Sequence, residues 1–98
     1  MAREASVRVA RVSGEGQQSV SVTTSSAATS NAITSDECLV YANVECFVVA
    51  GSNPTATVAA GTPIAANAMI RLTGLQAGDK LAFIAASGSG TAYVRPGA

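Results

Sequence analysis

The sequence predicts an all-β fold: a compact antiparallel β-sandwich or barrel, jelly-roll-like, with about eight short strands. Short apolar segments recur at spacings near ten residues, and Gly, Ser, Asn or Pro separates them. Leu, Ile, Val and Phe together number 21, against 20 Ala and 20 Ser plus Thr, so we expect a thin core. The 98 residues suit one domain. We divide them into an N-terminal arm, 1–5, and a single β-domain, 6–98.

The first two expected strands are separated by a glycine-rich turn. Residues 7–12 alternate Val with Arg or Ala, and Gly14 and Gly16 end this segment. Residues 18–24 alternate again, with Val on one face and Ser or Thr on the other. We therefore expect a hairpin, followed by a surface loop over 25–35 because that segment has little bulk and no sustained period.

The most apolar segment predicts the central strands of the fold. Residues 38–51 read CLVYANVECFVVAG, which we interpret as two strands broken near Asn43. Pro54 and Gly51, the latter able to adopt a positive φ, predict a turn after them. The residues expected to supply most of the core are Leu39, Phe47, Val49, Ile70, Leu72, Leu81, Phe83 and Ile84.

The remaining strands are expected over 55–58, 69–74, 81–86 and 91–98, with Pro63 and Ile64 in an extended connection between the first two. The alternative is a helix over 65–72, where AANAMIRL contains good helix formers between a proline and a glycine.

The charge balance excludes several classes of function. Six Lys plus Arg offset six Asp plus Glu, whereas nucleic-acid-binding proteins usually carry an excess of basic residues, so we expect no nucleic-acid partner. No apolar run approaches the roughly 18 residues that span a bilayer, and the first ten residues lack the apolar stretch of a secretory signal. We therefore expect no association with a membrane. We also expect the protein to be made in the cytoplasm of the host cell.

The sequence offers few groups for catalysis. With no histidine, it cannot form Ser-His-Asp or Cys-His nucleophilic arrangements. Asp36 and Glu37 are adjacent, but neighbours on a strand point to opposite faces, so we interpret them as solvated charges where a strand begins. We expect Asp79, in AGDK, to be a turn residue rather than a calcium ligand. The prediction is a protein that is not an enzyme and has no cofactor or metal.

Two cysteines and two glycine-rich segments have simple structural interpretations. Cys38 and Cys46 would face each other in a hairpin turning about Ala42, which would make a disulfide conceivable, but buried free thiols are the favoured interpretation. The segments 14–16 and 88–90, GEG and GSG, lack the lysine and the helix of a phosphate-binding loop, so we expect hairpin turns.

Three arginines near the N-terminus are the candidate interface residues. Arg3, Arg8 and Arg11 supply half of the six basic residues. Exposed, outward-facing side chains are the simpler interpretation. The alternative is an arm or edge strand that pairs with acidic groups of another subunit, because the guanidinium group is a planar donor suited to interfaces.

The second half of the chain resembles small virion proteins of tailed bacteriophages. The matching segments are an apolar strand before GSNPTA (47–56), AGTPI (60–64) and IAASGSGTAYVRPG (84–97). The resemblance implies a compact β-domain that decorates or cements a phage capsid, or a minor component elsewhere on the virion such as the neck or tail. It implies no catalytic residue.

The functional expectation is therefore a structural virion protein that stabilises the shell, with the major capsid protein and further copies of itself as partners. We expect it to be located in the virion. A thin-cored domain gains from burial against many identical copies. The alternative is a carbohydrate-binding β-module, in which only Tyr41 and Tyr93 could stack on a sugar because the chain has no Trp.

Overall fold

The computed structural model describes residues 17–33 and 35–96, which form two antiparallel sheets of four strands each and no helix. The strands are β1 (Gln18–Val22), β2 (Ala27–Ala28), β3 (Glu37–Ala42), β4 (Cys46–Gly51), β5 (Thr62–Ile64), β6 (Ala68–Thr73), β7 (Lys80–Ile84) and β8 (Gly90–Pro96). The all-β prediction is confirmed, and the helix considered over 65–72 does not form.

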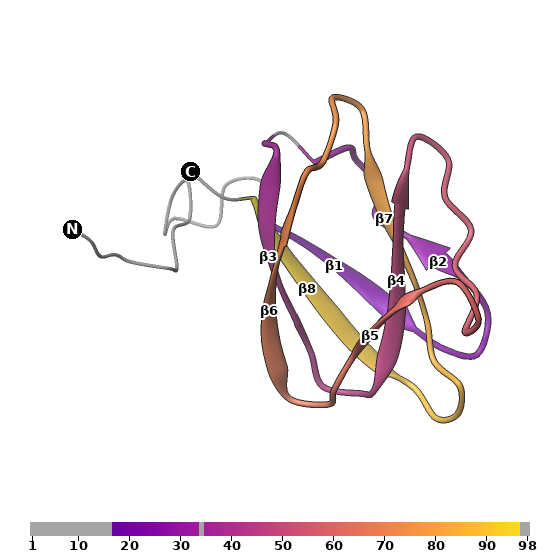
Figure 1. Ribbon diagram of the computed structural model, residues 1–98. Helices are drawn as coiled ribbons and strands as arrows, with labels where there is room; N and C mark the ends of the chain where they lie inside the picture. Colours follow the sequence, from indigo (N-terminus) through magenta and orange to yellow (C-terminus); the bar gives the residue numbers. More distant parts are fainter. Residues whose placement is uncertain (1–16, 34, 97–98) are drawn as a thin grey trace.

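The strand order is that of a jelly roll. Sheet I has the order β1-β8-β3-β6 and sheet II the order β2-β7-β4-β5. The antiparallel pairs β1–β8, β2–β7, β3–β6 and β4–β5 follow one another along a long two-stranded ribbon, as in a jelly roll. Successive pairs belong alternately to sheet I and sheet II. Figure 1 shows the two sheets facing each other, with β3 and β6 on one side and β4 and β5 on the other.

Alternation of small apolar residues explains why these segments pair as strands. In β3 the positions that join the core cluster, Cys38, Val40 and Ala42, are two residues apart, which is the period of one sheet face. In β8, Ala92 and Val94 follow the same rule. These inward positions of sheet I face those of sheet II across the core.

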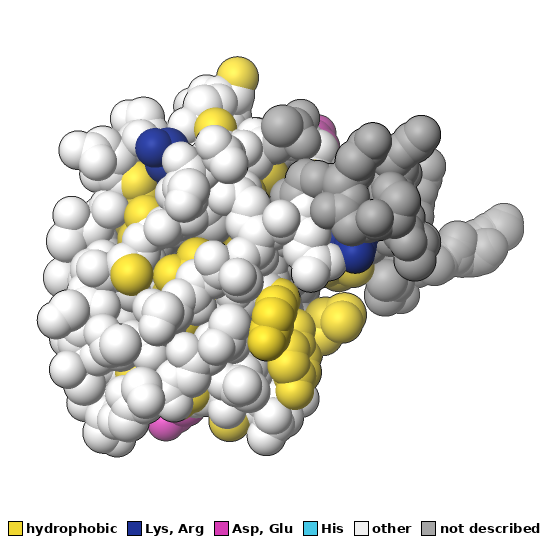
Figure 2. All heavy atoms as spheres, turned by 180° about the vertical axis from the view of Figure 1, so that it is seen from behind, with side chains coloured by type: hydrophobic (Ala, Val, Ile, Leu, Met, Phe, Trp, Pro, Cys, Tyr) yellow, Lys and Arg dark blue, Asp and Glu magenta, His cyan; other side chains and the backbone are white. Residues whose placement is uncertain are grey.

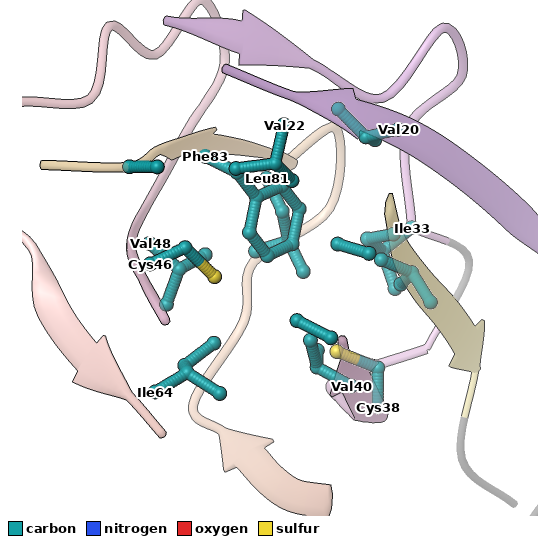
Figure 3. Close-up of a cluster of buried hydrophobic side chains, with 14 residues drawn as sticks. Val20, Val22, Ile33, Cys38, Val40, Cys46, Val48, Ile64, Leu81 and Phe83 are labelled. Carbon is teal, nitrogen blue, oxygen red and sulfur yellow. The ribbon is translucent and has the colours of Figure 1, made fainter. Parts of the chain in front are cut away.

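The core is built from both sheets around one aromatic ring. Phe83 is fully buried, and Leu81, Val22, Val40, Val94 and Ile64 are buried with it. In Figure 3 the labelled side chains of β3 and β4 enter the cluster from opposite sides, and Phe83 and Leu81 lie between them. The prediction of Leu39, Leu81 and Phe83 as buried residues is confirmed, although Leu39 lies outside this cluster.

Five of the predicted core residues are not fully buried. In β4 the inward residues are Cys46 and Val48, so Phe47 and Val49 point to the other face and remain half-buried. Ile84, in β7, is also half-buried. In β4 the large side chain of Phe47 is expected inside, but strand periodicity places the smaller Cys46 and Val48 there. Ile70 and Leu72 are partly buried and pack against the core cluster.

The segment 25–33 is mostly irregular and exposed, as predicted for a surface loop, but part of it pairs with sheet II. It contains β2, and Thr29 continues the pairing with β7 because its N–H donates to the Leu81 carbonyl at 2.9 Å. Ile33 is buried, and its N–H donates to the Asp79 carbonyl at 2.7 Å. Pairing with β7, which no local pattern predicts, thus holds residues 27–29 in place.

The connection over 52–61 covers the outer face of sheet II. It contains no strand, so the strand predicted over 55–58 is wrong. Ala56 is buried, and its N–H donates to Ser26 Oγ at 2.8 Å. A Cβ built on Gly61 would lie 2.6 Å from the Cβ of Phe47, so the chain passes directly over β4. Figure 1 shows this connection on the side of sheet II that faces away from sheet I.

Several predicted turns have a different geometry from the one expected. Gly51 ends β4 without a positive φ, whereas Gly78 and Gly88 have φ values of +90° and +78°. The segment 88–90 connects β7 in sheet II to β8 in sheet I, so it is not a hairpin turn. Of the hairpin predicted over 7–24, the second strand is β1, whereas the first strand, 7–12, and the turn at 14–16 lie outside the described residues.

The first prediction compares the two phenylalanines. We expect Phe83→Ala to lower the free energy of unfolding by about 3–5 kcal/mol, because it empties the centre of the core. Phe47→Ala should lower it by less, since Phe47 points away from the core cluster and is only partly buried. Urea denaturation of both variants measures the difference. Equal losses would contradict the inward direction assigned to Phe83.

The second prediction concerns a close approach at the start of β8. The Thr91 N–H donates to Asn43 Oδ1 at 2.8 Å, and a Cβ on Gly90 would overlap that oxygen and lie 2.7 Å from Val44 Cγ1. We expect Gly90→Ala to cost about 1–3 kcal/mol in urea denaturation. Gly51→Ala is the matched control, because its Cβ would meet only Pro54 at 3.7 Å; a similar loss there would refute the steric explanation.

Candidate binding face

The outer face of sheet I carries the molecule's two tyrosines in one row. Tyr93 on β8 lies opposite Ser19 on β1 and opposite Tyr41 on β3. Tyr41 in turn lies opposite Met69 on β6. This row, Ser19–Tyr93–Tyr41–Met69, therefore crosses all four strands, and we call it the tyrosine row.

The two tyrosine rings lie close together without covering each other. Their centroids are 6.2 Å apart and their planes are inclined by 30°. At that separation neither ring is stacked tightly on the other's face. The Tyr41 hydroxyl donates to Asn67 Oδ1 at 3.0 Å, and the Asn67 N–H donates to the Ala42 carbonyl at 2.8 Å. Asn67, held at a φ of +62° in the turn before β6, thus fixes the position of the Tyr41 hydroxyl.

A second row contains two arginines on either side of a leucine. Leu39 on β3 lies opposite Arg95 on β8 and opposite Arg71 on β6. The Arg95 guanidinium donates to Gln17 Oε1 at 2.5 Å. Arg71 forms an ion pair with Glu37, in which its Nε donates to Glu37 Oε1 at 2.5 Å. These contacts orient both guanidinium groups along the sheet.

Between the two rows lies a groove of about 250 Å³. Its lining residues are Gln17, Leu39, Tyr41, Met69, Tyr93, Val94 and Arg95. Met69 and Tyr93 are 59% and 41% exposed, which makes them two of the three large hydrophobic residues exposed among those described. Figure 2 shows apolar side chains gathered on the molecular surface next to a basic side chain. The groove is thus an open site with an apolar floor and a polar end.

The two sheets differ in what lies over their outer faces. On sheet II the outward residue Ala82 is completely buried, and the 52–61 connection passes over Phe47. On sheet I the tyrosine row keeps Met69 and Tyr93 exposed. The face of sheet I is therefore the better candidate for contact with another molecule.

The arginines predicted as interface residues, Arg3, Arg8 and Arg11, lie outside the described residues. The predicted roles of the acidic residues are clearer. Glu37 pairs with Arg71 instead of standing alone in solvent, whereas Asp36 is exposed. Asp79 is a turn residue as expected, since its carboxylate accepts the Gln76 N–H at 2.9 Å. Among residues 17–33 and 35–96, no three His, Cys, Asp or Glu side chains lie together as a metal site would require.

Cys38 and Cys46 are buried free thiols, as the favoured interpretation predicted. They do not face each other in a hairpin, because β3 belongs to sheet I and β4 to sheet II. Burial raises the pKa of the Cys38 thiol to about 11, and the nearby Glu37 carboxylate adds to this effect. Burial, with a contribution from Glu45, also raises the pKa of Cys46. Both thiols act as small apolar side chains in the core.

Sequence reasoning found part of the candidate face. It named Tyr41 and Tyr93 as the two aromatic residues able to stack on a sugar, but it did not place them side by side. It assigned no binding role to Met69, Leu39 or Arg95. The signal available in the sequence was alternation along each strand, because each of these residues occupies a position that points away from the core. Which strands become neighbours, however, is not encoded in local alternation.

No helix in the described part of the chain is long and apolar enough to cross a membrane. Comparisons with protein-family models, curated proteins and solved structures find no match to this chain. The resemblance to small virion proteins therefore stays a prediction from the sequence.

The third prediction follows from the raised thiol pKa. Because Cys38 stays protonated in the folded protein up to about pH 11, its contribution to stability is constant below its ordinary pKa of 9.0. Above pH 9 the unfolded chain releases this proton while the folded chain keeps it, so the free energy of unfolding falls. We expect the urea midpoint to fall less steeply between pH 9 and 11 in Cys38→Ala; an unchanged slope would contradict the prediction.

Proposed function

We propose that this protein is a structural virion component that decorates or cements a bacteriophage capsid and catalyses no reaction. Its partners would be the major capsid protein and further copies of the same chain, and its location the virion. The observation that carries the proposal is the pair of long edge strands on a small jelly roll. The arm that would reach a neighbour, residues 1–5, lies outside the described residues.

The edges of the two sheets differ in a way that favours pairing through sheet I. The edges of sheet II are β2, with two residues, and β5, with three residues including Pro63. Short strands and proline protect an edge against pairing. Among the strands of residues 17–33 and 35–96, sheet I ends instead in β1 and β6, which have five and six residues and no proline. A neighbouring subunit could add a strand there.

The fold and the thin core support the same proposal. Jelly rolls build many viral capsid domains, although that similarity is one of fold alone. The buried side chains are mostly Val, Ala and Cys, so the isolated domain has few large apolar groups in its core. A protein that binds an assembled shell stabilises the bound state by mass action, and symmetry repeats each contact over the shell.

A carbohydrate-binding module is the second candidate function. The observation that favours it is the placement of Tyr41 and Tyr93 on adjacent strands of an exposed sheet face. Lectin domains also use the jelly roll. The two candidates require different surfaces of sheet I, its edges for the first and its outer face for the second.

The fourth prediction tests attachment to the shell. Deleting residues 1–5 should leave the urea midpoint unchanged, because the sequence MAREA gives these residues no evident core role, but it should weaken binding to phage heads that lack the protein. Co-sedimentation with such heads measures binding. The full chain should also raise the temperature at which these heads release DNA, and the deletion variant should not.

A matched pair of variants separates charge from geometry in the N-terminal segment that follows the arm. Replacing Arg8 and Arg11 by Ala should weaken binding in the full chain. Replacing both by Lys keeps the charge but loses the planar donor, so it should weaken binding as well if the guanidinium geometry matters. Binding of wild-type strength by the deletion variant and by both double variants would refute the role of the N-terminal segment. Failure of the wild-type chain to bind heads would refute the decoration proposal itself.

A further inference from the structure

We propose that the groove along the tyrosine row binds a neutral carbohydrate, with one hexopyranose ring seated on Tyr93 and Tyr41. The proposal rests on the second candidate function and names its site and ligand class. It requires neither attachment to a capsid nor the N-terminal arm.

The aromatic residues supply the apolar half of sugar recognition. A pyranose ring presents C–H groups on one face, and an aromatic ring presents a flat apolar face with a negative quadrupole, so the two surfaces attract each other. Because the tyrosine centroids are 6.2 Å apart and the rings do not cover each other, ring surface remains available to a ligand. The exposure of Tyr93, 41%, makes it the first contact.

The polar groups next to the rings supply the other half. Asn67 accepts the Tyr41 hydroxyl through Oδ1, which leaves its side-chain N–H groups for a ligand hydroxyl. Gln17 lines the groove and accepts Arg95 through Oε1. Ser19 is exposed in the same row, beside Tyr93. Hydroxyl-rich ligands need such donors and acceptors around an apolar floor.

The size and composition of the face favour a sugar over a protein partner. The groove volume of about 250 Å³ lies below the roughly 300–1,000 Å³ of sites for drug-sized ligands, which suits a single ring. The outward positions around it are mainly Ser, Thr, Gln, Glu and Arg, whereas the core of a stable subunit interface is depleted of charged residues. Arg71 is paired with Glu37 beside the groove, so the charges of these two side chains offset each other there.

The amino-acid composition provides a direct probe of this site. The chain has no Trp, and its only two Tyr are Tyr41 and Tyr93, so intrinsic tyrosine fluorescence arises entirely from the proposed site. We would titrate the purified full chain with four neutral hexasaccharides: maltohexaose, cellohexaose, mannohexaose and chitohexaose. Concentrations up to about 10 mM detect a Kd near 1 mM. We expect a saturable change in fluorescence with at least one of them.

Variants then assign the binding to the rings. Tyr93→Ala should weaken binding of the responding sugar by tenfold or more in calorimetry, whereas Tyr93→Phe keeps the ring and should stay within about threefold of the wild type. Val58→Ala is the matched control, because Val58 is 43% exposed but lies in the 52–61 connection over sheet II. It should leave the affinity unchanged.

Two outcomes overturn the proposal. One is the absence of any saturable response to all four sugars. The other is concentration-dependent dimerisation in analytical ultracentrifugation that Tyr93→Ala abolishes, which would assign the face to a second copy of the chain. Because the titration uses no phage particles, its failure leaves the capsid proposal standing, and failure of attachment to heads leaves the sugar site standing.

Discussion

The packing of Phe83 between two faces of small side chains is the interaction on which the rest of the structure depends. Phe83 is the largest fully buried side chain, and Val, Ala, Leu, Ile and Cys residues from both sheets surround it. Facing sheets in a sandwich lie about 10 Å apart, and small residues alone fill that space poorly. The buried thiols of Cys38 and Cys46 belong to this filling, and for that reason they stay protonated.

The two sheets that enclose this core are joined almost entirely by connections that cross from one to the other. Only β4 and β5 are both consecutive in the chain and paired. The outermost pair of sheet I joins β1 near the beginning of the described chain to β8 at its end. Closing such distant pairs costs chain entropy before contacts repay it, so folds of this type form slowly compared with helical ones.

The same topology gives the two outer faces different characters. β4 and β5 are consecutive strands that pair with each other at one edge of sheet II. The 52–61 connection between them is long enough to pass over the outer face of that sheet. Sheet I receives no such cover from the described chain and keeps Met69 and Tyr93 exposed. Its edges and its face thus offer separate surfaces, so assembly into a shell and recognition of a sugar are compatible in one small domain.

The sequence by itself determined the fold class and six of the eight strands of the described residues, because alternation with period two and Gly or Pro at the ends are local properties. It left a helix over 65–72 open, which the structure excluded. It also predicted the state of both cysteines. It missed β2 and β5, which are too short to show a period and exist because β7 and β4 pair with them. It placed Phe47 and Val49 in the core, since a run of apolar residues does not reveal which parity faces inward. Only the tertiary structure decided that parity and brought Tyr41 beside Tyr93, because which strands become neighbours depends on contacts between residues far apart in the chain.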